Sequence, residues 1–398
     1  MNGPAVTGPF GLGAALAERE QVGLLRRRIA TDGASGGRLK VAGREYLNFS
    51  ANDYLGLAEH GAIKAAFNAG IERYGTGSGA SPLVTGYSRA HQQLEETLAE
   101  WLGVEAVLLF NCGFSANQAV LKALLGKEHL LWQDKLNHAS LQEMGSQLPC
   151  KMKRFGHNDM AVLERQLEPN RGLIVSEGVF SMDGDQAPWG ELAALAARSG
   201  NWLMIDDAHG LGVLGSEGRG TLAAQGVPPA SVHIQMGTFG KALGVAGAFV
   251  GGSRELVEYL VNFARHYVYS THMPAAQACA VSKSIELVRA ADESRAHLGQ
   301  LIARFRQGAK DQGWQLGASD TPIQPLLVGE SSVALQLAER LRERGVWVSA
   351  IRPPTVPVGT ARLRITLSAA HREQDVDRLL DALGVCPAVT TLGEVHHG

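Results

Sequence analysis

The sequence predicts an α/β protein with a mostly parallel central sheet and helices on both of its faces. Between about residues 62 and 290, short apolar runs alternate with helical patterns, as in "AVLLF" followed by "NQAVLKALL" and "LIVSEG" followed by "ELAALAARS". Such alternation is typical of strand–helix–strand units, whose strands run parallel. The 398 residues suffice to bury a large core, and the 48 glycines exceed the usual share of about 7%, which favours close backbone approaches.

The same pattern divides the chain into three parts. Residues 1–61 form an N-terminal segment, in which residues 1–13 predict a loose arm, Ala14 to Ile29 a helix and "EYLNF" a strand. Residues 62–290 form the large domain that contains the sheet. The order then changes to a long helical stretch, several short strands and a final helix, which predict a smaller C-terminal α+β domain over residues 291–398.

Composition and charge limit the kinds of partner. A net charge of -2 without a long basic run argues against nucleic acid as a partner. The sequence has neither an 18-residue apolar run nor the pattern of a secretion signal. The four cysteines, Cys112, Cys150, Cys279 and Cys386, are widely spaced and indicate neither a disulfide framework nor a zinc site. We therefore expect a cytoplasmic protein without a metal ion, a nucleic-acid partner or a membrane anchor.

Polar residues follow four of the expected strands, and open α/β sheets bind ligands beyond the carboxyl ends of their strands. After "AVLLF", the turn from Asn111 to Ser115 leads into a helix whose N-terminus favours a phosphate, although most such turns bind nothing. At the end of "WLMID", Asp206 would be costly to leave charged without a partner, and His209 follows three residues later. A capped strand end with a salt bridge explains this pair equally well, whereas a metal pair lacks a third ligand.

The other two places are weaker when each is considered alone. In "SEGVFSMDGD", Glu177, Ser181 and Asp183 follow a strand, but a plain Asp-Gly turn would explain Asp183 without any function. His138 follows another strand and opens a helix. Single histidines of this kind are more often structural than catalytic.

Lys241 changes the interpretation of these four places. It lies in "TFGKALGVAGA" among small and apolar residues, where an amine loses part of its preference for the charged state and can form a Schiff base. Pyridoxal 5'-phosphate (PLP) would use Lys241 together with groups from three of these places. The helix start after Gly113 suits its phosphate, Asp206 its pyridine nitrogen and His209 its phenolic oxygen, while His138 can stack on its ring.

Other motif interpretations fit less well. "GTFGKA" is not a P-loop, because Ala242 stands where Ser or Thr is required. "GTGSGAS", residues 75–81, follows a helix-like segment and lacks the G-x-G-x-x-G of dinucleotide-binding proteins. Its serines also lack the G-x-S-x-G setting of an esterase nucleophile.

Taken together, the motifs resemble those of the α-oxoamine synthases, a family of fold-type I PLP-dependent transferases. The resemblance runs from about Leu16 to Leu383 and rests on "NDYLGL", "TGYSRAHQQLE", "NCGFSANQAV", "NHAS", "EGVFSMDGD", "DDAHGLGVLG", "TFGKALGVAGA", "YSTHMP" and "RPPTVPVGTARLRITLSAAH". It implies PLP as the cofactor and a homodimer with active sites at the subunit interface. Two departures are Pro82, where many relatives carry a different and often basic residue, and Ala275, where a second proline is common.

The resemblance also implies roles for individual residues around the cofactor. Lys241 would bind PLP covalently and act as the base, with Asp206 at the pyridine nitrogen, His209 at the phenolic oxygen and His138 stacked on the ring. Further positions near the cofactor are Ser181, Gly113, Phe114 and Thr238, together with Ser270 and Thr271, which would reach the phosphate of the neighbouring subunit.

For the substrates, the resemblance implies that Arg352 binds the carboxylate of the amino acid and that Asn52 lies near it. Arg26 would contact the acyl substrate, and Thr355 belongs to the same substrate-binding group. The segments "LLRRR", "YLNFSANDYLGL" and "AIRPPTVPVGTARLR" are most similar to the branch that condenses L-alanine with a pimeloyl thioester in biotin biosynthesis.

Several alternatives stay open at this point. The pimeloyl group could be carried by coenzyme A or by an acyl carrier protein. Sister enzymes, namely 2-amino-3-ketobutyrate CoA ligase (glycine C-acetyltransferase), 5-aminolevulinate synthase and serine palmitoyltransferase, would share every cofactor residue. A non-catalytic PLP-binding regulator should carry an additional module, for which the matched region leaves no room.

Overall fold

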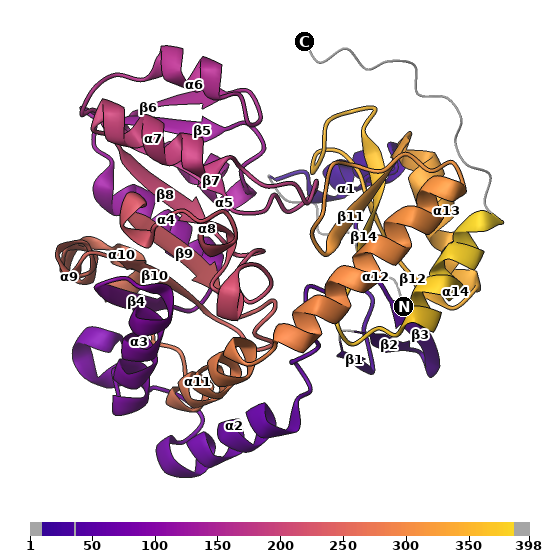
Figure 1. The fold of residues 1–398 in the computed structure, drawn as a ribbon, viewed down its shortest axis with the longest axis horizontal. Coiled ribbons are helices and arrows are strands. Elements are labelled where there is room, and N and C mark those ends of the chain that lie inside the picture. Colours follow the sequence, from indigo (N-terminus) through magenta and orange to yellow (C-terminus); the bar gives the residue numbers. More distant parts are fainter. Residues whose placement is uncertain (1–9, 36, 386–398) are drawn as a thin grey trace.

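The largest element of the computed structural model, which describes residues 10–35 and 37–385, is a seven-stranded sheet (Figure 1). Its strand order is β4-β10-β9-β8-β7-β5-β6. β10 runs antiparallel to β4 and β9, and the other neighbours are parallel. The strands are β4 (Ala106–Phe110), β5 (Leu130–Asp134), β6 (Lys151–Phe155), β7 (Gly172–Glu177), β8 (Trp202–Asp206), β9 (Ile234–Thr238) and β10 (Ala248–Gly252). The predicted mostly parallel sheet is confirmed.

Helices cover both faces of this sheet because its side chains alternate between two apolar cores. In β7, Leu173 and Val175 pack with one core and Ile174 with the other. The helices on the first face are α4 (Gly113–Leu124), α5 (Ala139–Gln147), α9 (Arg254–Phe263) and α10 (Arg265–Val268). The second face is covered by α6 (Met160–Gln166), α7 (Trp189–Ser199) and α8 (Thr221–Ala224), and near β4 by α3 (Arg89–Leu102), α11 (Ala275–Arg289) and α2 (Gly61–Tyr74).

A second, smaller unit combines residues from both ends of the chain. Its four-stranded sheet has the order β1-β2-β3-β12, in which Val346 pairs with Leu47 in parallel register. The strands are β1 (Gly33–Ser35), β2 (Arg38–Val41), β3 (Arg44–Asn48) and β12 (Val346–Trp347). A three-stranded sheet of β11 (Ile323–Gly329), β14 (Ala361–Thr366) and β13 (Ser349–Ile351) lies beside α12 (Asp292–Asp311), α13 (Ser331–Glu343) and α14 (Glu373–Gly384) (Figure 1). Residues 33–48 therefore share a sheet with the C-terminal part.

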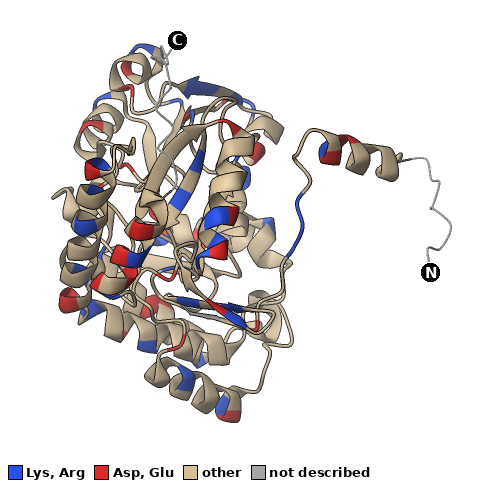
Figure 2. Cartoon of the chain, turned by 90° about the vertical axis from the view of Figure 1, so that its right-hand side faces the viewer, with Lys and Arg blue, Asp and Glu red and all other residues tan. Residues whose placement is uncertain are grey.

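The N-terminal helix is shorter than the sequence predicts. α1 spans Leu12–Gln21, so the helix expected to reach Ile29 ends eight residues early, because Gly23 adopts a left-handed φ of 67° just after it. None of the α1 residues is buried, and Figure 2 shows the helix extending away from the rest of the chain. The loose arm expected over residues 1–13 falls partly outside the described residues, since those begin at 10, but Leu12 and Gly13 already belong to the helix.

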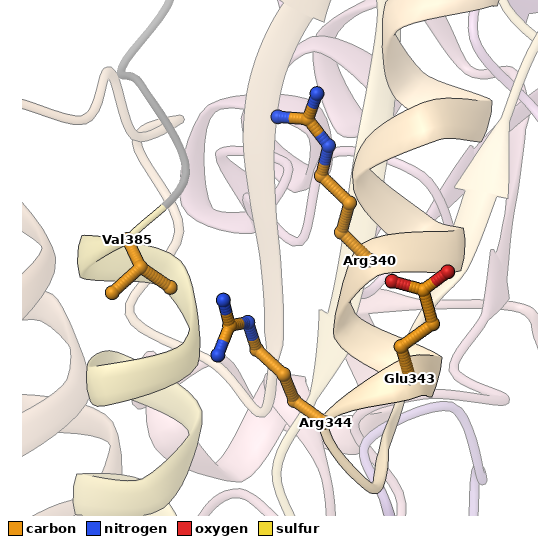
Figure 3. Close-up of a pocket in the computed structure, with 4 residues that line it drawn as sticks. All are labelled: Arg340, Glu343, Arg344 and Val385. Carbon is orange, nitrogen blue, oxygen red and sulfur yellow. The ribbon is translucent and has the colours of Figure 1, made fainter.

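A surface hollow of about 510 Å³ lies between α13 and the end of α14 (Figure 3). Arg340, Glu343, Arg344 and Val385 line it, and none of these is a predicted site residue. Cys386, the last of the four cysteines, lies outside the described residues. Within residues 10–35 and 37–385, we find no helix with the combined length and apolar character that a membrane crossing requires.

Candidate active site

Lys241 lies in the connection between β9 and β10, at the edge of the sheet where β5, β7, β8 and β9 end. Its Nζ is 2.7 Å from Nε2 of His209. Burial lowers the pKa of Lys241 to about 8, although the charges of Asp206 and Glu177 act in the opposite direction. The uncharged form of the amine is therefore much more populated near neutral pH than it is in an exposed lysine, although the charged form still predominates.

Two glycines give the connection its shape. Gly244 has a φ of 66°, and a Cβ there would lie 2.5 Å from the backbone nitrogen of Ala58. Gly247 has a φ of 100°, and its Cβ would lie 2.9 Å from Cε of Met273. Both positions therefore require glycine for backbone conformation and for close packing against neighbouring segments.

His209 connects Lys241 to a tyrosine from a distant part of the chain. The hydroxyl of Tyr54 is 2.6 Å from Nδ1 of His209, opposite the ring nitrogen that faces Lys241. Burial lowers the pKa of His209 well below its usual value, with a further contribution from the charge of Lys241, so the ring is neutral. Burial also raises the pKa of Tyr54 to about 12, which keeps its hydroxyl protonated. Lys241, His209 and Tyr54 thus form a chain of three polar groups.

Asp206 ends β8 and is 4% exposed. Its Oδ2 accepts a hydrogen bond of 2.8 Å from Nδ2 of Asn117, and its Oδ1 accepts one of 3.1 Å from the backbone of Ala208. Hydrogen bonds to a carboxylate stabilise its charged form. Asp206 can therefore present a negative charge to a cationic ring nitrogen.

His138 is the N-cap residue of α5, as the sequence predicts. Its Nδ1 accepts a hydrogen bond from the backbone nitrogen of Ser140 at 3.2 Å and lies 2.8 Å from the Ser140 hydroxyl. Burial lowers its pKa. Phe114 meets the imidazole edge-on, with the ring centroids 6.5 Å apart.

The first turn of α4 offers backbone donors. The helix begins at Gly113, and its N-cap residue Cys112 makes no side-chain capping hydrogen bond, so the first N–H groups can bind an anion. A Cβ on Gly113 would lie 4.0 Å from Cβ of Thr238, which places these two predicted phosphate-binding residues side by side. The Thr238 hydroxyl donates to the carbonyl of Gly247 at 2.8 Å.

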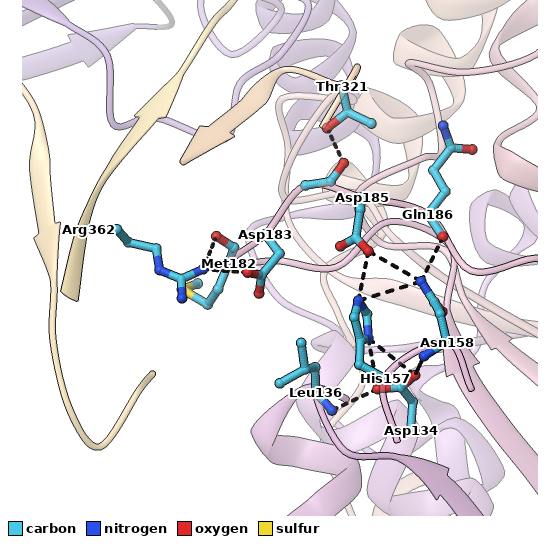
Figure 4. A network of polar contacts seen from close by, with 11 residues as sticks. Asp134, Leu136, His157, Asn158, Met182, Asp183, Asp185, Gln186, Thr321 and Arg362 are labelled. Carbon is cyan, nitrogen blue, oxygen red and sulfur yellow. Dashed lines mark hydrogen bonds and ion pairs between the residues drawn. The ribbon is translucent and has the colours of Figure 1, made fainter. Parts of the chain in front are cut away.

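The loop that follows β7 is attached to the smaller unit, as the contact between Asp183 and Arg362 shows (Figure 4). The Ser181 carbonyl accepts a hydrogen bond of 2.7 Å from Nε of Arg364. Asp183 forms an ion pair with Arg362, and the carbonyl of Gly184 accepts a hydrogen bond of 2.9 Å from Thr321. Asp183, which the sequence could explain as part of a plain turn, therefore joins the loop to β14.

The same loop is attached to the large sheet through His157 (Figure 4). Nδ1 of His157 is 3.1 Å from Asp134, and Nε2 is 2.7 Å from Asp185. Burial lowers the pKa of His157, but the hydrogen bonds and charges of the two carboxylates outweigh it and raise the pKa to about 10. A charged imidazole therefore bridges two carboxylates next to the candidate site.

Three of the four predicted substrate residues lie where the N-terminal arm contacts the C-terminal part, whereas Asn52 lies against Arg364. Nη2 of Arg26 donates to the hydroxyl of Thr355 at 3.1 Å, and the guanidinium of Arg352 donates to the carbonyl of Gly23. The cofactor positions Ser270 and Thr271 lie between α10 and α11, where the Thr271 carbonyl accepts a hydrogen bond of 2.9 Å from Asn111. Their contact with a second subunit remains a prediction.

The family model for class I and II aminotransferases matches residues 44–383. The chain is 88% identical over 396 residues to an 8-amino-7-oxononanoate synthase of Aeromonas hydrophila, with 100% of both chains covered. The chain belongs to this synthase family. The family uses PLP, so the fold-type I architecture and the cofactor expected from the sequence are both confirmed.

Solved structures show how widely the fold is shared. A serine palmitoyltransferase variant from S. paucimobilis with PLP bound in a myriocin adduct has a TM-score of 0.89 and 26% identity, covering 94% of this chain and 96% of its own. An 8-amino-7-oxononanoate synthase from Francisella tularensis has a TM-score of 0.76 and 28% identity, covering 85% and 97%. The architecture is therefore shared by a serine palmitoyltransferase and by an 8-amino-7-oxononanoate synthase.

The residues of this synthase family member fit PLP. The partly neutral amine of Lys241 suits the aldehyde, the buried carboxylate of Asp206 suits the ring nitrogen, and the uncapped start of α4 suits the phosphate. The neutral His209, supported by Tyr54, suits the phenolic oxygen. Each group matches a different part of the cofactor.

The structure places two further residues at the synthase site, Arg364 and Glu177, to which the sequence assigned no role. Arg364 is buried in β14, donates to Oδ1 of Asn52 from both terminal nitrogens at 3.2 Å, and is one of the charges that lower the pKa of Lys241. The strand "ARLRIT" gave a signal, since two arginines alternate with apolar residues. Glu177 is 2% exposed, and burial followed by the charge of Asp206 raises its pKa well above the usual value.

The two departures from the family pattern have local structural roles. Pro82 is buried at the start of a short helical turn, Pro82–Gly86, and Ala275 is the first residue of α11 after the N-cap residue Pro274. Proline at a helix start and alanine after it both suit the first turn. Neither side chain takes part in the contacts of Lys241, Asp206 or His209 described above.

Proposed function

We propose that the chain condenses L-alanine with a pimeloyl thioester to give 8-amino-7-oxononanoate, CO2 and free thiol, as a step of biotin biosynthesis. The single observation that carries this proposal is the 88% identity over the full length to the Aeromonas hydrophila synthase. Similarity to serine palmitoyltransferase, at 26% identity, supports the shared fold and cofactor but does not choose the acyl substrate.

When bound, PLP withdraws electrons from the Cα of the amino acid and so stabilises the negative charge that loss of a proton or of CO2 leaves there. Lys241 holds the cofactor and takes the proton from Cα of alanine. Its pKa of about 8 suits both tasks, because a general base works best near the operating pH. Asp206 keeps its negative charge against the ring nitrogen, and hydrogen bonds from Asn117 and Ala208 support it.

The remaining groups orient the reactants. His209 and Tyr54 hold the phenolic side of the cofactor, while Thr238 and the start of α4 bind its phosphate. His138 stacks on the ring and donates a hydrogen bond to the thioester oxygen, which accepts negative charge as the new carbon–carbon bond forms. The thiol leaves as this bond replaces the carbon–sulfur bond of the thioester, and loss of CO2 and return of a proton to Cα then complete the reaction.

Two arginines are candidates for the carboxylate of alanine. The family resemblance assigns this role to Arg352, whereas Arg364 is buried, bonds Asn52 and influences Lys241 electrostatically. We favour Arg364 for the carboxylate of alanine, because the charge of Arg364 is one of the main contributions that lower the pKa of Lys241, whereas the charge of Arg352 is not. Arg26, Arg352 and Thr355 then serve the pimeloyl chain. The active unit is a homodimer in which Ser270 and Thr271 contribute to the partner's phosphate site.

The test is a matrix of alanine, glycine and serine against pimeloyl, acetyl, succinyl and palmitoyl thioesters, scored by thiol release and by the mass of the product. We expect alanine with pimeloyl-CoA or pimeloyl-acyl carrier protein to give the highest kcat/KM. The comparison of these two thioesters decides which carrier delivers the pimeloyl group to the enzyme. Preference for glycine with acetyl-CoA or succinyl-CoA would instead identify a sister synthase. A Lys241→Ala variant provides the background rate.

A further inference from the structure

Asn117 and Ser140 connect Asp206 with His138 through buried hydrogen bonds. Nδ2 of Asn117 donates to Oδ2 of Asp206 at 2.8 Å and to the hydroxyl of Ser140 at 3.0 Å. That hydroxyl lies 2.8 Å from Nδ1 of His138. Asn117 is 1% exposed and Ser140 is 0% exposed, and they lie on the adjacent helices α4 and α5. None of the roles implied by the family resemblance involves either residue.

The protons in this chain have one consistent arrangement. A carboxylate only accepts hydrogen bonds, so the NH2 group of Asn117 must face Asp206, and its two protons serve Asp206 and Ser140. The Ser140 hydroxyl accepts from Asn117, so its own proton points to Nδ1 of His138, which also accepts from the backbone N–H of Ser140. With two donors facing Nδ1, a neutral His138 carries its proton on Nε2.

The orientation of the Asn117 amide leaves one of its buried polar atoms without a hydrogen bond. Its Oδ1 is buried and has no hydrogen-bond partner among the described residues. Turning the amide over would give that oxygen the Ser140 contact but would place it against the carboxylate of Asp206. An unsatisfied buried polar atom is rare in proteins and calls for a reason. Here the reason is that both donors of the amide are in use.

We propose that Asn117 and Ser140 are positioning residues that keep the proton of His138 on Nε2 and off Nδ1. This inference rests on the proposed function, in which His138 donates a hydrogen bond to the thioester oxygen. Protonation of Nδ1 would require both donors to turn away, so the two residues also hold His138 in its neutral form. Asp206 and Lys241 are the charged groups near this histidine, and Glu177, whose pKa burial raises, is a further titratable group beside them. None of these residues is substituted in the variants below, and Ser140→Ala also leaves the hydrogen bond from Asn117 to Asp206 in place.

The experiment compares Ser140→Ala with the wild type as full-length holoenzyme carrying ¹⁵N-labelled histidine. Losing one of two donors at Nδ1 should raise the pKa of His138, followed by NMR, by about half to one unit. The acidic limb of kcat/KM for pimeloyl-CoA should move upward by the same amount. The KM for alanine should stay unchanged.

Two further variants complete the design. Asn117→Leu frees the Ser140 hydroxyl to turn away from His138, so it should shift the pKa of His138 in the same direction. This variant replaces Ser140→Ala in the experiment if Ser140→Ala does not fold. Ser199→Ala is the matched control, because its hydroxyl donates to the Leu195 carbonyl on α7, away from the site, and it should shift nothing. An unchanged pKa of His138 in a folded Ser140→Ala protein overturns the proposal. Absence of wild-type condensation overturns the proposed function, while the NMR result still decides the roles of Asn117 and Ser140.

Discussion

The charged bridge formed by His157 gives a quantitative prediction about stability. His157→Gln removes an imidazole that lies 3.1 Å from Asp134 and 2.7 Å from Asp185, and Asp134 has a fully buried side chain. The pKa of His157 is about 10 in the folded protein and about 6.5 in the unfolded chain. At 1.36 kcal/mol per pKa unit, this difference corresponds to a contribution of at most about 5 kcal/mol to the free energy of unfolding. The side chains of His157 and Asp185 are about one-fifth exposed, so we reduce this to about 3 kcal/mol.

The sign of the pH dependence follows from the raised pKa of His157. The bridge contributes its full stability below about pH 6.5, and the contribution declines as the pH rises and is lost through about pH 10. The wild type should therefore exceed His157→Gln by about 3 kcal/mol at pH 6.5 and by almost nothing at pH 10.5. Urea unfolding at one fixed protein concentration measures both differences.

A surface histidine provides the control for this experiment. His129→Gln removes an imidazole that is 38% exposed and lies 3.4 Å from Glu128, whose side chain is 70% exposed, and it should change stability by less than about 1 kcal/mol at either pH. The reasoning is refuted if His157 titrates near pH 6.5 in the folded protein. It is also refuted if His157→Gln destabilises the protein equally at pH 6.5 and pH 10.5.

Three further predictions concern the cofactor site. Lys241→Ala should lose covalent attachment of PLP, seen in the absorption spectrum and by mass after borohydride treatment, and at least the roughly 10²–10⁴-fold in turnover that a general base supplies; retained activity would contradict the assignment. Asp206→Asn should still bind PLP but slow exchange of the alanine Cα proton with D2O by orders of magnitude, and near-normal exchange by NMR would count against it. Tyr54→Phe removes one hydrogen bond to His209 and should weaken PLP binding about fivefold in a fluorescence titration, with unchanged affinity as the opposing result.

The sequence predicted the large sheet and the strand ends because local pattern determines both. Apolar runs marked the strands, and the polar residues after them, such as His138 and Asp206, lie at the carboxyl edge that a parallel sheet must share. The contacts of Arg364 could not be predicted in this way, because Asn52 is 312 positions away in the sequence. The end of α1 was missed for another reason. Its residues continue an acceptable helical pattern, and only the conformation of Gly23 stops the helix.

The pairing of β3 with β12 constrains the order in which a growing chain can become functional. During synthesis the large sheet can form as soon as β10 has emerged, and Lys241 and Asp206 then already have their places. The N-terminal strands β1, β2 and β3 must wait for their fourth strand, because β12, the parallel neighbour of β3, is made about 300 residues later. Arg364 emerges later still. A ribosome that stops before β14 therefore releases a chain with the lysine and aspartate of the cofactor site but without the guanidinium that we assign to the carboxylate of alanine.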